Sequence, residues 1–273
     1  MQKTFSTPTP VSLYVELGSG DLVVEAESLT ETVVDVEGKN AEEVVVDQRG
    51  DEIVVIAKQN RGGFFGPARD LTVRVRVPSD SRLTTKLGSA DLRTRGRLGE
   101  CMLKTGSGDV RIDELSGEGD LETGSGDVQI DVAAGPLQIR SGSGDVTLDQ
   151  VHGPVKVSTG SGDVLINSAS EPVQVKSGSG DMRVRHAEQD VALSTASGDL
   201  VIDEMHRGQL AAKNVSGDIR VGIPAGIPVW TDISSMTGSV RSDLQGAGEP
   251  AEGQDFIEVR AKTISGDVFL EQL

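Results

Sequence analysis

One aspartate recurs at a fixed spacing through the middle of the chain, and this series is the strongest candidate for chemistry in the sequence. Its members lie 18 residues apart, with a final step of 19: Asp91, Asp109, Asp127, Asp145, Asp163, Asp181, Asp199 and Asp218. In most repeats the aspartate ends the phrase Gly-Ser-Gly-Asp. Stacked carboxylates repel one another unless hydrogen bonds or cations offset their charge.

Two interpretations of the aspartate series follow. The one we favour is that each side chain accepts hydrogen bonds from backbone N–H groups of its turn. The alternative is calcium, because calcium-binding β-roll repeats also have an 18-residue coil with Gly and Asp at the turn. The phrase differs from those repeats, since Asp follows Gly directly and the half-repeat has no second Asp. Because we favour turn capping, we predict no cofactor and no metal. Under the calcium alternative, the candidate ligands are Asp109, Asp127, Asp145 and Asp163.

Other residue types that catalyse reactions form no recognisable constellation. The three histidines, His152, His186 and His206, fall in different repeats, and we expect them at the surface. The sequence contains no nucleophile elbow, phosphate-binding loop or zinc-ligand spacing. We therefore predict that the protein is not an enzyme, and we keep a carbohydrate-active β-helix enzyme as an alternative.

The chain is acidic, with 273 residues and a formal net charge of −17. This charge argues against nucleic acid and anionic membrane surfaces as partners, because both require clustered Lys and Arg. No stretch approaches the roughly 20 apolar residues of a transmembrane helix. Residues 1–11 lack the pattern of a signal peptide, so we expect a cytoplasmic location. The single cysteine, Cys101, is expected to be a buried free thiol.

The pattern of apolar residues predicts two short strands in each repeat. After each aspartate, inward and outward residues alternate, as in Val-Arg-Ile at 110–112, and a second alternation follows half a repeat later. Such a period of two indicates a strand with one buried face. The glycines of the phrase mark a turn where a Cβ would clash or φ is positive. The strict period predicts parallel coils stacked about 4.8 Å apart, with a meander of antiparallel hairpins as the competing architecture.

Less regular β-rich segments flank the repeats. We predict an N-terminal β cap at residues 1–87, a periodic body at 88–222 and a C-terminal β cap at 223–273, all in one continuous structural domain. Solenoids need caps because an end coil otherwise presents unpaired strand edges. The predicted fold is thus an all-β, single-domain parallel β-solenoid (β-helix) with 18-residue coils and β caps at both ends. We expect Trp230 to cover the last core layer.

Two adjacent phenylalanines, Phe64 and Phe65, lie in a glycine-rich segment between residues 59 and 70. One interpretation is that they fold back onto the N-terminal cap. The other is that they form an exposed tip that contacts a protein partner, because exposed apolar clusters often mark interaction sites. Phe64 and Phe65 are therefore the candidate interaction site.

Several segments carry a resemblance to a known family. Residues 73–78 (Val-Arg-Val-Arg-Val-Pro), Gly-Ser-Ala-Asp at 88–91, the repeated Thr-Gly-Ser-Gly-Asp-Val and the closing Thr-Ile-Ser-Gly-Asp-Val at 263–268 resemble the bacterial "putative adhesin" family. These are β-strand-repeat domains of unknown function, similar to the toastrack-type domains of envelope-stress proteins. The resemblance extends from about residue 10 to the end and implies no catalytic residues.

The residues and the resemblance together indicate a non-enzymatic structural or interaction module. We expect a bacterial protein-binding scaffold linked to envelope or stress functions, with an unknown protein partner, no nucleic acid and no insertion into a membrane. The alternatives are a calcium-stabilised adhesin and the carbohydrate-active enzyme mentioned above.

Overall fold

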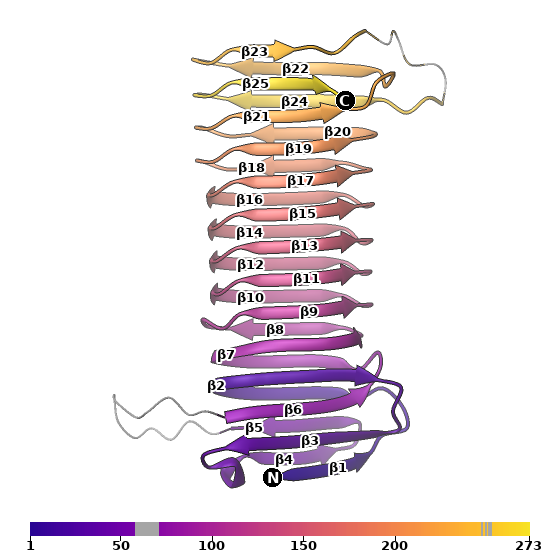
Figure 1. The fold of residues 1–273 in the computed structure, drawn as a ribbon, viewed down its shortest axis with the longest axis vertical. Helices are drawn as coiled ribbons and strands as arrows, with labels where there is room; N and C mark the ends of the chain where they lie inside the picture. The colour runs from indigo at the N-terminus through magenta and orange to yellow at the C-terminus, as the bar shows by residue number, and fades with distance from the viewer. Residues whose placement is uncertain (58–70, 247, 249, 251–252) are drawn as a thin grey trace. The chain divides into compact units, whose positions relative to one another are not determined.

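The computed structural model describes residues 1–57, 71–246, 248, 250 and 253–273. The chain divides into two compact units, residues 1–136 (unit 1) and 137–273 (unit 2). Each unit is built from short strands wound into coils (Figure 1), so the predicted all-β solenoid fold is confirmed. The expected limits of caps and body, at residues 87–88 and 222–223, stay predictions. No helix among the described residues is long and apolar enough to cross a membrane.

Unit 1 contains two long strands, each of which continues through the turn between the two strand positions of a coil, and several shorter strands. The long strands are β2 (Ser12–Glu27) and β7 (Arg82–Leu98). The other elements are β1 (Gln2–Ser6), β3 (Glu31–Gly38), the 3-10 helix η1 (Ala41–Glu43), β4 (Val45–Arg49), β5 (Glu52–Ile56), β6 (Leu71–Pro78), β8 (Cys101–Thr105), β9 (Val110–Leu115), β10 (Gly119–Ser125) and β11 (Val128–Ala133).

Parallel pairing one repeat apart holds the periodic part of unit 1 together. β8 pairs with β10 and β9 with β11, so that Leu103 lies opposite Leu121 and Val110 opposite Val128. β7 pairs with β8 through residues 83–87 and with β9 through residues 92–98. These pairings confirm the predicted coils, and the competing meander of antiparallel hairpins is wrong for these strands.

A further copy of the phrase, Gly-Ser-Gly-Asp-Leu at residues 18–22, stands apart from the repeats in the sequence and joins the stack directly. β2 pairs in parallel with β7, placing Asp21 opposite Asp91. Its other edge pairs with β5 and β6. β2 therefore lies between β6 and β7, against the order of the sequence (Figure 1). Antiparallel pairs, β1 with β3, β3 with β6 and β4 with β5, complete this end of unit 1.

Unit 2 repeats the two-strand coil. Its strands are β12 (Leu137–Ser143), β13 (Val146–Val151), β14 (Val155–Ser161), β15 (Val164–Ala169), β16 (Val173–Ser179), β17 (Met182–Ala187), β18 (Val191–Ser194), β19 (Leu200–Met205), β20 (Gly208–Lys213), β21 (Ile219–Ile223), β22 (Val229–Ser235), β23 (Val240–Ser242), β24 (Ile257–Thr263) and β25 (Val268–Gln272).

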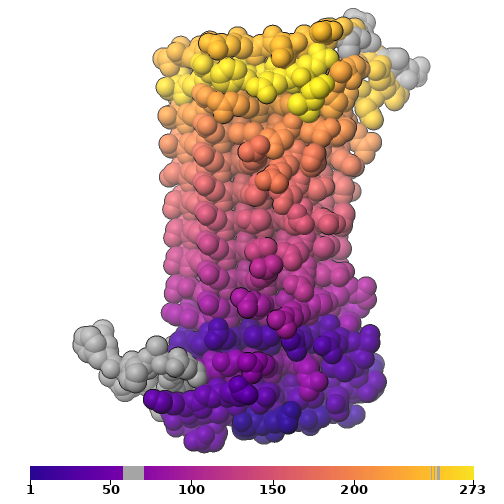
Figure 2. Space-filling view, viewed as in Figure 1, coloured from indigo at the N-terminus to yellow at the C-terminus, as the bar shows by residue number. Residues whose placement is uncertain are grey.

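The last coil of the sequence is not the last coil of unit 2. β24 pairs in parallel with β20 on one edge and with β22 on the other. β25 likewise lies between β21 and β23. In the space-filling view the yellow C-terminal segment lies between orange layers, as this order requires (Figure 2).

The core consists of the inward residues of these strands. In unit 2, Val146, Leu148, Val164 and Ile166 are all at most 2% exposed. Burial of such Val, Ile and Leu columns is the main force that drives the coils to stack. Trp230 does not belong to this core, because its side chain is 55% exposed. The expectation that it covers the last core layer is wrong. Trp230 lies opposite Glu258, whose side chain points outward, so the Trp230 side chain also points away from the core.

Cys101 begins β8 and is buried, as expected. Removal from water raises the pKa of its thiol to about 12. Because the thiolate is the reactive form, we expect no reaction of the native protein with an aromatic disulfide reagent and one reactive thiol per chain in denaturant. Absorbance of the released thiolate measures this, and complete modification of the native protein would contradict it.

Asp80 stabilises the corner between β6 and β7 with a left-handed backbone (φ 63°). Arg97 donates to its Oδ2 atom at 2.6 Å, and the Ser116 hydroxyl donates to Oδ1 at 3.0 Å. The hydrogen bond from Arg97 is the main cause that lowers the pKa of Asp80 below its ordinary value of 3.8. A carboxyl group with a lowered folded-state pKa stabilises the fold above the unfolded-state pKa, and this contribution is lost as pH falls through the folded-state pKa.

Asp80→Asn tests this corner, because asparagine tolerates the left-handed backbone but carries no charge. We expect a loss of about 0.5–1 kcal/mol in the free energy of unfolding at pH 7, since the pair with Arg97 is half-exposed. The difference from the parent should shrink once pH falls below about 4. Urea unfolding of the variant and the parent at pH 7 and at a pH below about 4 measures this difference in the free energy of unfolding. An equal difference at the two pH values would refute the role of the charge.

Candidate functional site

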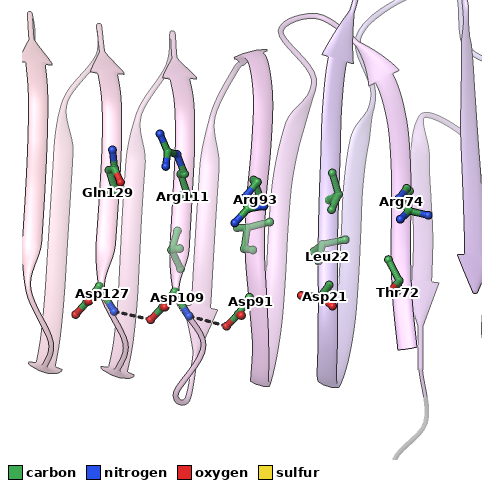
Figure 3. A pocket seen from close by; sticks show the side chains of 13 residues that line it. Asp21, Leu22, Thr72, Arg74, Asp91, Arg93, Asp109, Arg111, Asp127 and Gln129 are labelled. Atoms are coloured by element: carbon green, nitrogen blue, oxygen red, sulfur yellow. Dashed lines mark hydrogen bonds between the residues drawn. The ribbon is translucent and has the colours of Figure 1, made fainter. Parts of the chain in front are cut away.

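The aspartates form a hydrogen-bonded ladder in each unit. In unit 1 the backbone N–H of Asp109 donates to Asp91 Oδ1 at 3.0 Å, and that of Asp127 donates to Asp109 Oδ1 at 2.9 Å (Figure 3). The carboxylates accept backbone hydrogen bonds, as expected, but the interpretation that each aspartate caps its own turn is wrong. The donor comes from the neighbouring coil and not from the aspartate's own turn, which the sequence did not indicate.

The ladder of unit 2 runs through both regular and isolated copies of the phrase. Its N–H to Oδ1 hydrogen bonds, each 2.8–2.9 Å long, join Asp163 to Asp145, Asp181 to Asp163, Asp199 to Asp181, Asp218 to Asp199 and Asp267 to Asp218. The N–H of Ser239 donates to Asp267 at 2.8 Å. This backbone hydrogen bond is the main cause that lowers the pKa of Asp267. Backbone donors thus offset the repulsion between these carboxylates.

The calcium candidates lie within these ladders. Asp109, Asp145 and Asp163 each use one carboxylate oxygen to accept a backbone N–H. Within the described part of the chain, no group of three or more His, Cys, Asp or Glu side chains is arranged to hold a metal ion. The calcium site stays a hypothesis. A lower melting temperature in EDTA would support it, and an unchanged one would reject it.

A groove of about 440 Å³ crosses five neighbouring strands of unit 1, β6, β2, β7, β9 and β11 (Figure 3). Along one side lies an acidic row, formed by Asp21, Asp91, Asp109 and Asp127. Along the other lies a basic row, formed by Arg74, Arg93 and Arg111. The apolar lining residues between the rows, Leu22, Leu92 and Val110, are buried. We refer to this feature as the two-row groove.

The repeat itself produces the two rows. In a strand, residues two apart lie on the same face, so the outward residue two after each aspartate joins the aspartate at the surface. Parallel register then aligns equivalent residues, with Arg93 opposite Arg111 and Arg111 opposite Gln129. Row members on adjacent strands are therefore about 4.8 Å apart, and the rows are about 7 Å apart along the strands. Arg74 and Arg93 are about twice that spacing apart, because Val23 of β2 lies between them.

Arg93 and Arg111 are exposed and form no hydrogen bond or ion pair with any residue that the structure describes. Arg74, by contrast, pairs with Glu37 at 2.9 Å. Like charges opposite one another on neighbouring strands destabilise a sheet. Arg93 and Arg111 are thus placed where they cost stability, and their guanidinium groups remain available to an anionic group.

The sequence analysis treated this outward column only as part of the strand pattern and did not select its arginines. The available signal was arginine at the same repeat position in two consecutive repeats, at 93 and 111. Elsewhere in unit 1, charges of opposite sign pair across neighbouring strands, as where Lys104 contacts Glu122 at 2.7 Å.

The histidines are exposed, as expected, and two of them, from different repeats, contact the same glutamate. His186 Nδ1 lies 2.9 Å from one carboxylate oxygen of Glu204, and His206 Nε2 lies 3.1 Å from the other. The parallel register that places His186 opposite Glu204 brings them together. The other candidate site, Phe64 and Phe65, lies outside the described residues.

Comparisons with known proteins identify the class. The profile of the Toastrack DUF4097 family matches residues 11–271, and the chain belongs to this family. The resemblance seen in the sequence is thereby confirmed. No curated protein matches the chain.

Three solved structures from bacteria align with nearly the whole chain. A "putative lipid binding protein" from Parabacteroides distasonis is 12% identical, with 98% of this chain and 96% of that chain covered and a TM-score of 0.47. A "putative adhesin" from Bacteroides fragilis is 10% identical, with 100% and 96% covered and a TM-score of 0.35. A "putative cell adhesion protein" from Clostridium sporogenes is 12% identical, with 100% and 99% covered and a TM-score of 0.25.

Proposed function

We propose that this protein is a non-enzymatic protein-binding scaffold, linked in bacteria to envelope or stress functions, and that the two-row groove is its contact surface. The observation that carries the proposal is the in-register pair Arg93 and Arg111, which no described residue neutralises. Family membership supports an interaction module in general terms. The cytoplasmic location expected from the sequence is part of the proposal, and cell fractionation tests it.

The groove is well suited to binding because its strands are already held in place. β2 pairs along both edges, and β7 pairs with β2 as well as with β8 and β9. A surface that is ordered before binding loses little entropy when a partner docks.

Co-purification from the native host tests the proposal. The groove variant carries Arg93→Ser and Arg111→Ser. A matched control carries Arg49→Ser and Arg82→Ser, which remove the same charge from exposed positions of unit 1 outside the groove. We expect a specific partner to be recovered with the parent and the control, and reduced at least tenfold with the groove variant, because two charge-assisted contacts are lost.

An unchanged partner in the groove variant would reject the groove as the contact surface. A third variant, Phe64→Ser with Phe65→Ser, tests the other candidate site in the same experiment. Loss of the partner only in this variant would transfer the proposed contact to residues 64 and 65.

A further inference from the structure

We infer that the two-row groove binds an extended peptide segment in which acidic and basic residues alternate. This inference rests on the proposed function and specifies the chemistry of the partner. It is carried by the dimensions of the groove and by the opposite charges of its two rows.

The dimensions favour an extended chain over a helix. The rows are about 7 Å apart, whereas an α-helix with its side chains is about 10–12 Å wide. The groove crosses five strands, a length of about 19 Å at 4.8 Å per step. About six residues of extended chain, at about 3.3 Å each, fill that length.

The two rows dictate the order of charges in such a segment. Successive side chains of an extended chain point to opposite sides. In a chain lying along the groove, every second residue faces the basic row, and the residues between them face the acidic row. Acidic residues on one side and basic residues on the other therefore satisfy both rows.

Each row offers groups of the required kind. The planar guanidinium groups of Arg93 and Arg111 can each form two parallel hydrogen bonds with a carboxylate. In the acidic row, Asp91 and Asp109 each accept a backbone N–H through Oδ1. Their Oδ2 atoms form no hydrogen bond within the described part of the chain, so they can receive a lysine ammonium group.

The acidic row also argues against a polyanion. Nucleic acid or an anionic lipid surface could contact the two arginines, but it would bring further negative charge to within about 7 Å of the aspartates. The net charge of −17 adds to this repulsion. A segment with both charges meets attraction at each row and gains specificity from their order.

Fluorescence anisotropy with labelled peptides tests the inference on the full chain. The probe is an eight-residue peptide of alternating Glu and Lys, and its control is a block peptide with four Glu followed by four Lys. The two have the same composition and net charge. We expect the alternating peptide to bind at least tenfold more tightly at low ionic strength and to weaken as salt is added.

Variants and a third ligand complete the test. Arg93→Ser with Arg111→Ser should weaken binding of the alternating peptide at least tenfold, and Arg49→Ser with Arg82→Ser should leave it unchanged. Equal binding of the two peptides, no response to the groove variant, or tighter binding of inorganic polyphosphate would each overturn the inference. If the native partner still depends on Arg93 and Arg111 while the alternating peptide does not bind, only the partner chemistry is wrong and the proposed function stands.

Discussion

Replacement of Gly180 by alanine should lower the free energy of unfolding of unit 2 by about 3 kcal/mol. Gly180 has φ +123°, a backbone conformation that residues with a side chain rarely adopt. A Cβ at this position would also lie 2.7 Å from the carbonyl carbon of Gly162 on the neighbouring coil, and closer still to its oxygen. The coils would have to move apart, which would break the parallel pairing that holds them.

A thermal melt measures this effect, with an expected decrease of roughly 5 °C in Tm for a chain of 273 residues. Gly246→Ala is the matched control, because Gly246 has no positive φ and a Cβ added there would meet no atom within 4 Å. The control should remain within about 0.5 kcal/mol of the parent. Equal stability of the two variants would show that the close approach of successive phrases is not required.

The second large effect is expected from Ile166→Ala. Ile166 lies on β15, is fully buried, and stands opposite Val184 in the inward column of unit 2. Truncation of a buried isoleucine removes transfer free energy and leaves a cavity, which together cost about 2–5 kcal/mol. Stacked coils cannot close such a cavity easily, because both neighbouring layers are fixed by their strand pairing.

Leu165→Ala is the control for this prediction. Leu165 is the neighbouring residue on the same strand, and its outward side chain is only partly buried. The loss should be below about 1 kcal/mol. Urea unfolding of both variants measures the difference, and a larger loss at Leu165 than at Ile166 would contradict the assignment of inward and outward residues.

Local patterns were sufficient to predict the coil. The period of two after each aspartate identifies Val110 and Ile112 as inward, and both are buried in the structure. The repeated glycines indicated the corner, and Gly162, Gly180 and Gly198 all have positive φ there. These features depend on residues close together in the chain, so periodicity and backbone sterics reveal them without knowledge of the neighbouring coil.

Contacts between coils were harder to predict. The donor to each aspartate comes from the next coil, and Glu204 brings together His186 and His206 from different repeats. The same lateral stacking places Arg93 and Arg111 side by side in the two-row groove. Each of these contacts requires the register between coils, which the outward residues by themselves do not reveal.

The order in which the coils stack shows most clearly what the sequence alone does not reveal. From the sequence, the copies of the phrase at residues 18–22 and 264–268 are recognisable, and so are the strands around them. The strands that pair with these copies cannot be recognised from the sequence, because each coil presents the same backbone hydrogen-bonding edges and could pair with any other coil. Only the folded chain shows that β2 lies between β6 and β7, and that β24 lies between β20 and β22.

Burial supplies the physical reason for the order in unit 2. The inward residues of β24, Ile257, Val259 and Ala261, are fully buried. In β22 the residues opposite them are Val229, Thr231 and Ile233, which all remain partly or largely exposed. The more apolar coil takes the interior position and the more polar coil takes the end, because this arrangement removes the larger apolar area from water.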